Sequence, residues 1–169
     1  MKSKIIISWI FVILWMIFIF CMSNMNNETS NYGSKTTITK VVEKTVETTN
    51  SIGITDKHPS NQKLNDFTNI LNLPFRKCIH AFEYLVLSIL LIIALSSSGV
   101  KGNKIYIISI IICFIYACTD EYHQLFIDGR TGQFMDVLID ISGGLIGIVI
   151  IKLLEIIKNK LKRVGCNEN

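Results

Sequence analysis

The chain has 169 residues, half of them hydrophobic and 18% charged, with a formal net charge of +4. The apolar residues are clustered and the mean hydropathy is positive, which excludes an ordinary soluble domain. The positive charge does not indicate a nucleic-acid partner, because the basic residues near the apolar clusters are explained by membrane topology and by attraction to anionic lipids.

Four apolar stretches approach the roughly 20 helical residues that cross a hydrocarbon core about 30 Å thick. They cover residues 5–22, 79–98, 105–118 and 134–154. The first could also be a signal peptide, since it has a basic start and an apolar centre. However, it ends in "FIFCMSN", without a small-x-small cleavage site. The sequence therefore predicts an all-α polytopic membrane protein, a four-transmembrane-helix bundle with an uncleaved first helix.

Basic residues flank these stretches in three places. Lys2 and Lys4 precede the first stretch, Lys101 and Lys104 separate the second from the third, and "KNKLKR" follows the fourth. With four spans, all three places fall on one side of the membrane. The positive-inside rule assigns that side to the cytoplasm, so both termini are predicted to be cytoplasmic.

Residues 23–75 form a polar segment between the first two spans. Within it, "ITKVVEKTVETTN" and "LNDFTNILNL" each place apolar residues on one helical stripe, while "GITDKHPSN" indicates a linker. We predict two short amphipathic helices outside the membrane, and a mostly disordered tether is the alternative. The predicted division is residues 1–22 (cytoplasmic start and first helix), 23–75 (external segment), 76–157 (three-helix core) and 158–169 (basic cytoplasmic tail).

The chain has five cysteines and no CxxC spacing. Cys21, Cys78 and Cys118 fall near the outer ends of predicted helices, so a disulfide between two of them is compatible with their positions. Small buried thiols are the preferred interpretation.

Charged residues recur at the outer ends of the last three spans. Arg76, His80 and Glu83 share one helical face in the second. The third has an apolar run too short to cross, so its helix must continue through Asp120, Glu121 and His123 to reach about 20 residues. Within it, the spacing of Tyr116, Asp120 and Gln124 puts these side chains on one face.

In the fourth span, Asp136 and Asp140 lie one turn apart and precede a GxxxG pair, Gly143 and Gly147, on the same side. Such a pair lets a helix of the same or another chain approach closely, so this face is expected to look into a bundle. Because ionisable residues in membrane spans are costly, one shared extracytoplasmic site is predicted, to which the last connection adds Arg130. The alternative is a purely structural network of ion pairs that also includes Lys77.

Three motifs resemble the VanZ-like family of bacterial membrane proteins. They are "FRKCIHAFEY" (75–84), "DEYHQLFIDGR" (120–130) and "DVLIDISGGLIG" (136–147). The resemblance covers residues 76–150 well, whereas the first helix and the external segment match only in layout. One departure is Asp128, which stands where the family often has a proline before Gly-Arg.

The resemblance implies a small multi-pass protein of the bacterial plasma membrane and cell envelope. The family's founding member is associated with low-level resistance to the glycopeptide teicoplanin. From the motifs and the helical faces, the residues predicted to bind a ligand are Arg76, His80, Glu83, Tyr84, Asp120, Glu121, Gln124, Arg130, Asp136 and Asp140.

Two functions remain open at this point. The first is binding or shielding at the outer leaflet, where Arg76 and Arg130 would engage a lipid headgroup, a lipid-linked cell-wall precursor or a glycopeptide. The second is an enzyme on a lipid-linked substrate, with acid/base candidates His80, Glu83, Asp120, Glu121 and His123. A divalent cation held by carboxylates is a variant of the second, but the chain shows no metal motif of known spacing, so no metal or cofactor is predicted.

Overall fold

The computed structural model describes residues 2–25, 27–51, 61–127, 130 and 132–167, with the side chains of 27, 28, 50, 61 and 163–167 left out of the description. These residues form five helices and no strand: α1 (Lys2–Ser23), α2 (Asn27–Ser51), α3 (Asn61–Ser97), α4 (Lys104–Gln124) and α5 (Phe134–Asn167). Four of them, α1, α3, α4 and α5, are long and apolar enough to cross a membrane. The predicted all-α fold with four membrane helices is confirmed.

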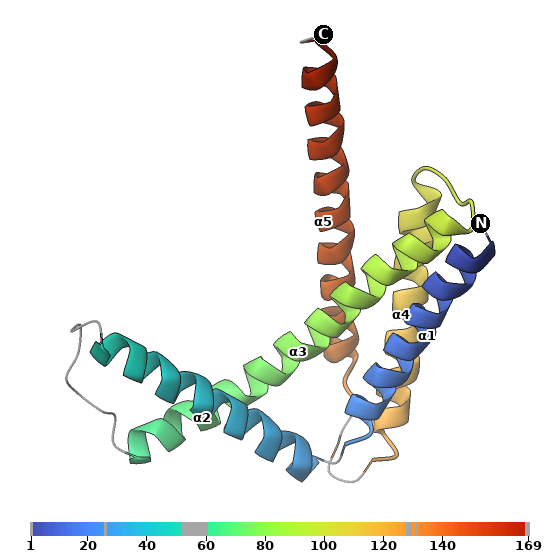
Figure 1. Ribbon diagram of the computed structural model, residues 1–169. Coiled ribbons are helices and arrows are strands. Elements are labelled where there is room, and N and C mark those ends of the chain that lie inside the picture. Colours follow the sequence, from blue (N-terminus) through green and yellow to red (C-terminus); the bar gives the residue numbers. More distant parts are fainter. Residues whose placement is uncertain (1, 26, 52–60, 128–129, 131, 168–169) are drawn as a thin grey trace.

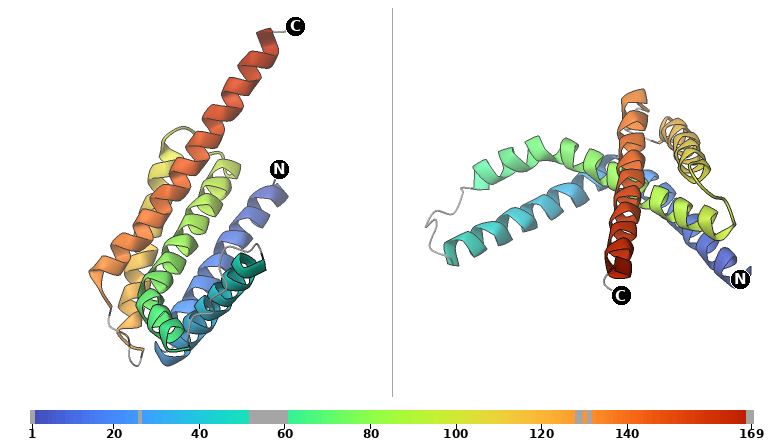
Figure 2. Two further views of the ribbon diagram at one scale, coloured as in Figure 1. Left: turned by 90° about the vertical axis from the view of Figure 1, so that its left-hand side faces the viewer. Right: turned by 90° about the horizontal axis from the view of Figure 1, so that it is seen from above.

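Helix α3 is the centre of the molecule and contacts each of the other four helices. Figures 1 and 2 show α1, α4 and α5 around the second half of α3, while α2 lies along its first half. The N-terminus, the α3–α4 turn and the C-terminal end of α5 point the same way (Figure 1). We call the opposite end, where α1 and α4 finish and α5 begins, the distal end.

The polar segment after α1 differs from the prediction. Its first predicted helix is the 25-residue α2, and its second is not separate but forms the beginning of the 37-residue α3. This helix runs through Pro74, which lacks a backbone N–H and so removes one hydrogen bond of the helix. Most of the predicted linker at 53–61 lies outside the described residues. The described part of the segment is helical and not a disordered tether.

The buried core lies where α1, α3, α4 and α5 meet. It contains Val12 and Ile19 of α1, Leu87 and Leu91 of α3, and Cys113 of α4. Many large apolar side chains on the outer faces of α1, α4 and α5 are exposed, as expected for surfaces that face lipid. Helix α5 continues beyond residue 154, where the fourth apolar stretch ends, so the first part of the basic tail is helical.

The GxxxG pair joins two helices within this chain. A Cβ atom added at Gly143 would overlap the backbone of Ala81, and one added at Gly147 would lie 2.7 Å from the carbonyl oxygen of Leu85. The backbones of α5 and α3 are therefore in direct contact along this line, as small residues allow between membrane helices.

The four cysteines whose side chains are described are free. Cys113 is buried, but Cys21 and Cys78 are exposed, so the expectation of buried thiols is wrong for these two. Their positions along the helix axis could be predicted from the sequence. It did not give the rotation of the helix about that axis, which decides whether a side chain points inward.

Candidate functional site

Charged side chains from three helices meet at one place at the distal end. They line a cavity of about 170 Å³, which we call the charged cavity. Its walls consist of Leu73, Arg76, Lys77, His80, Glu121, Gln124, Arg130, Gln133, Asp136, Ile139 and Asp140. The structure therefore brings together most of the predicted ligand-binding residues. The remaining three, Glu83, Tyr84 and Asp120, do not line this cavity and are buried.

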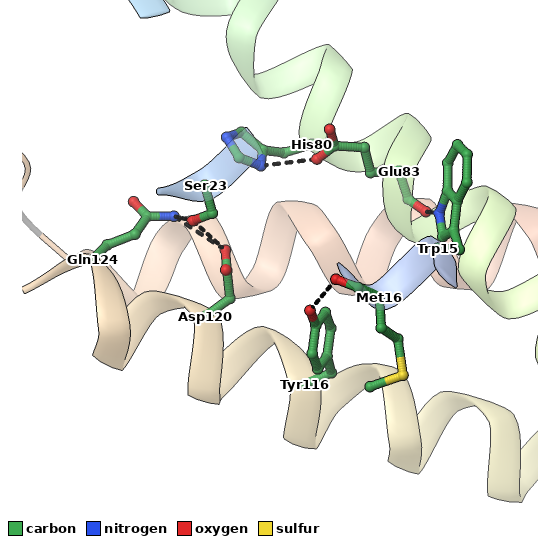
Figure 3. Close-up of polar contacts among 8 residues, drawn as sticks. All are labelled: Trp15, Met16, Ser23, His80, Glu83, Tyr116, Asp120 and Gln124. Carbon is green, nitrogen blue, oxygen red and sulfur yellow. Dashed lines mark hydrogen bonds and ion pairs between the residues drawn. The ribbon is translucent and has the colours of Figure 1, made fainter. Parts of the chain in front are cut away.

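Asp120 is fixed by a small hydrogen-bond network that includes the end of α1 (Figure 3). Its Oδ2 accepts a hydrogen bond of 2.9 Å from the Ser23 hydroxyl and one of 3.2 Å from Gln124 Nε2. Gln124 Nε2 also lies 3.0 Å from the Ser23 hydroxyl. Because the Asp120 side chain is 3% exposed, these polar contacts are what make burial of the carboxylate tolerable.

His80 and Glu83 form a pair one turn apart on α3, in the direction of α1 (Figure 3). His80 Nδ1 lies 3.3 Å from Glu83 Oε2. The backbone carbonyl of Glu83 accepts a hydrogen bond of 2.9 Å from Trp15 Nε1, which ties this turn of α3 to α1. The imidazole thus has a fixed carboxylate neighbour while its ring reaches the charged cavity.

Two contacts connect the start of α5 to its neighbours. Lys77 Nζ lies 2.6 Å from Asp136 Oδ1, and both side chains are about one-third exposed. The backbone N–H of Gln133 donates a hydrogen bond of 2.9 Å to Glu121 Oε2. A Cβ atom at Gly132 would lie 2.6 Å from the backbone oxygen of Glu121, so the chain passes directly over α4 here. Asp136 and Glu121 therefore both have partners within the protein.

The two arginines of the cavity are held differently. Arg76 Nη1 donates a hydrogen bond of 2.9 Å to Asn31 Oδ1 of α2, and the same oxygen accepts one from Asn72. Arg130 Nε is buried and has no hydrogen-bond partner among the residues that the structure describes. Burial lowers the pKa of the Arg130 guanidinium, while nearby Asp120 and Glu121 favour its charged form. A guanidinium stays protonated in either case.

Two further buried side chains, Asp140 and Tyr84, carry polar atoms without a partner in the part of the protein that the structure describes. Asp140 is 1% exposed, and its Oδ1 has no hydrogen-bond partner within the described part of the chain. The Tyr84 hydroxyl is in the same situation, with its ring fully buried. An unsatisfied buried polar atom costs about 1–3 kcal/mol. Asp140 lines the charged cavity and Tyr84 does not, and an unpaired buried atom at a cavity wall calls for an explanation other than packing.

Several sequence-predicted residues lie elsewhere. His123 does not line the charged cavity, because its ring packs against Phe20 of α1 with 4.6 Å between ring centroids. Asp128, which departs from the family pattern, lies outside the described residues. No group of three or more His, Cys, Asp or Glu side chains is placed to hold a metal ion among the residues described.

Sequence reasoning missed Ser23, Asn31 and Gln133. Ser23 had a usable signal, since it is the polar residue that ends the first apolar stretch, at the level of the other outer charges. Asn31 had none, because it is one of many polar residues in its segment. The Gln133 contact uses the backbone, which no side-chain pattern reveals.

The helix segments that carry His80 and Glu83, Asp120 and Glu121, and the two aspartates of α5 lie within a region that matches a known family. The family model VanZ/LLP1 matches residues 8–155. The chain belongs to the VanZ/LLP1 family. The match includes α1, α2 and the beginning of α3, so family membership extends well beyond the three motifs. No curated protein and no solved structure matches the chain significantly.

Proposed function

We propose that this VanZ/LLP1-family membrane protein binds an anionic group of an outer-leaflet ligand in the charged cavity. The ligand classes are a membrane lipid, a lipid-linked cell-wall precursor or a glycopeptide. The observation that carries the proposal is the meeting of Arg76 and Arg130 in one cavity, where the buried Nε–H of Arg130 has no hydrogen-bond partner among the described residues. Guanidinium groups suit phosphate and carboxylate because they form two parallel hydrogen bonds.

The orientation of the site follows from the lysines at the other end. Lys2, Lys4, Lys101 and Lys104 lie at the end opposite the charged cavity, together with the basic tail. The positive-inside rule then places the distal end outside the cytoplasm. In this orientation the cavity meets the outer leaflet of a bacterial plasma membrane.

The acidic residues of the site do not argue against an anionic ligand. Asp136 pairs with Lys77, Glu121 accepts from the Gln133 backbone, and Asp120 accepts from Ser23. These carboxylates thus have partners within the protein, and Asp120 and Glu121 also favour the charged form of Arg130. Glu121 and Asp136, which line the cavity, also offer hydrogen-bond acceptors to an amine elsewhere on the same ligand.

Binding can be tested with dihexanoyl phosphatidylglycerol, a short-chain anionic lipid, added to the full chain in neutral maltoside detergent. A hydrogen bond to a charged group contributes about 1.5–3 kcal/mol, so Arg130→Gln and Arg76→Gln should each weaken binding by about tenfold or more. Lys101→Gln removes the same charge at the opposite end and should bind like the wild type. Equal affinities for all four proteins would place the binding elsewhere.

A second measurement links binding to the host. Membrane abundance and teicoplanin susceptibility are compared for cells that express the wild type, Arg130→Gln or Lys101→Gln. Loss of protection by Arg130→Gln at unchanged abundance supports a ligand site. A parallel fall of abundance and protection would instead mean that the charges mainly hold the bundle together.

A membrane enzyme is the second candidate function, and the His80–Glu83 pair beside the cavity favours it. His80 would act as general base, oriented by Glu83, while Arg130 stabilises developing negative charge. Mass spectrometry of phosphatidylglycerol incubated with the protein tests this function. A product formed by the wild type and not by His80→Gln, with binding unchanged, would establish it.

A further inference from the structure

Two more cavities follow α3 away from the charged cavity. The first, of about 270 Å³, lies where the end of α1, α2 and α3 meet. Its walls include Met22 of α1, Gly33 of α2 and Ile79 of α3. It shares Arg76, His80 and Arg130 with the charged cavity, so these three side chains stand between the two spaces.

The next cavity, of about 300 Å³, has walls of purely apolar or sulfur-containing side chains. They are Ile38, Val41 and Val42 of α2 with Leu71, Pro74, Phe75 and Cys78 of α3. Phe75 also lines the preceding cavity, which makes the two adjacent. We call these two cavities together the α2–α3 groove. The combined volume of the groove and the charged cavity falls within the range of about 300–1,000 Å³ that is typical of ligand pockets.

We propose that the α2–α3 groove holds the hydrocarbon chain of a phosphate-bearing membrane lipid whose head lies between Arg76 and Arg130. This inference rests on the proposed function and names its ligand class. The series of cavities changes from charged at one end to fully apolar at the other. A phosphate-bearing lipid changes in the same way along its length, from a charged head to an apolar chain. Each methylene group that binding removes from water increases the affinity about fourfold.

The walls favour a hydrocarbon chain over a peptide segment. An extended peptide would bring backbone polar groups against these apolar side chains, where they would lack partners. A hydrocarbon chain has no such groups.

Small residues on α2 create the space. Ser34 and Ile38 are buried on α3 and fix the helix, whereas a Cβ atom added at Gly33 would meet nothing within 4 Å. Gly33 therefore lines the groove without filling it. This gives a variant, Gly33→Leu, which adds a large side chain at the wall of the groove without a clash at its Cβ atom and has a higher helix propensity.

The test compares dioleoyl phosphatidylglycerol with sn-glycerol 3-phosphate, which has a similar head and no chain, on the full-length protein in maltoside detergent. Gly33→Leu should weaken binding of the long-chain lipid by about tenfold or more, because several methylene groups would no longer fit in the groove. The same variant should bind glycerol 3-phosphate with the affinity of the wild type. Thr36→Leu adds the same side chain at a position that lines neither cavity of the groove, and it should match the wild type.

The outcomes separate this inference from the proposed function. Equal affinity of Gly33→Leu and the wild type for the long-chain lipid overturns the groove assignment, even where Arg130→Gln still weakens binding. A proportional loss for both probes overturns it as well, because the head site would then be what changed. If the wild type binds neither probe, the proposed function itself fails.

A native cysteine gives a readout that needs no variant. Cys78 is exposed and lines the second cavity of the groove, while Cys21 is exposed and lines neither. Dioleoyl phosphatidylglycerol should slow maleimide modification of Cys78 several-fold relative to Cys21, as measured on peptides by mass spectrometry. Protection that instead follows protein concentration would assign the groove to a second copy of the chain and overturn the proposal.

Discussion

Helix α3 meets its two longest partners in opposite ways. Along its second half, α5 lies so close that the Cα atoms of Gly143 and Gly147 leave no room for a side chain. Along its first half, α2 lies beside a series of cavities, and Gly33 faces open space. Figure 2 shows the two partners on different parts of the same long helix.

The difference teaches that a small residue in a membrane-associated helix has no single structural meaning. Between α3 and α5, glycine permits backbone contact, which is a principal source of helix association where lipid is as apolar as the side chains. Between α2 and α3, glycine leaves a volume unfilled. Only the distance to the neighbouring backbone distinguishes a tight helix–helix contact from a binding groove.

The largest expected effect is that of Gly143→Ala. Its new methyl group would overlap the Ala81 backbone, so α5 must move away from α3. We expect a loss of about 1–3 kcal/mol or more in the free energy of unfolding, measured by denaturation in detergent. Gly144→Ala is the matched control, because its methyl group would meet the end of the flexible Ile110 side chain at 3.3 Å. Similar losses of stability for both variants would contradict the close backbone contact between α3 and α5.

The contribution of α1 to the packing of the second half of α3 can be measured at Trp15. Trp15→Phe keeps a ring in place but removes the hydrogen bond to the Glu83 carbonyl. Losing this hydrogen bond should cost about 0.5–1.5 kcal/mol by the same measurement. Trp9→Phe removes an exposed hydrogen bond to the Ser98 hydroxyl and should cost less. An equal cost would mean that the Trp15 contact has no special role at the site.

The smallest effect is a gain. Gly33→Ala adds a methyl group that touches nothing and removes a helix-weakening glycine from α2. The free energy of unfolding should rise by about 0.5–1 kcal/mol. Thermal unfolding of Gly33→Ala and Gly143→Ala, measured side by side, tests whether the first variant is stabilised and the second destabilised. Destabilisation by Gly33→Ala would show that α2 fits closely on α3 after all.

Much of the site was predictable from the sequence because hydrocarbon thickness imposes a length on each span. The third apolar run is too short, which required α4 to continue through Asp120 and Glu121, and it does. Asp140 was expected to face inward because it shares a side with Gly143, and its exposure is 1%. These predictions needed only helical periodicity and a count of residues.

Other features could not be predicted because they depend on which neighbour lies beside a helix. Cys21 and Cys78 were expected to be buried and are exposed. The beginning of α3 was expected to be a separate amphipathic helix because of its apolar stripe, but the helix continues through Pro74. The contact of Asn31 with Arg76 joins residues 45 positions apart, on helices whose pairing no local pattern specifies.

By itself, the sequence determined the number of spans, the end of the bundle that carries the charges and the family resemblance, because hydropathy, length and motif order are local properties of the chain. Only the tertiary structure decided that α5 closes tightly on α3, that Arg76 and Arg130 share two adjoining cavities, and that α2 leaves a groove. Those features depend on the rotation and spacing of helices, which are set by how all the side chains pack at once.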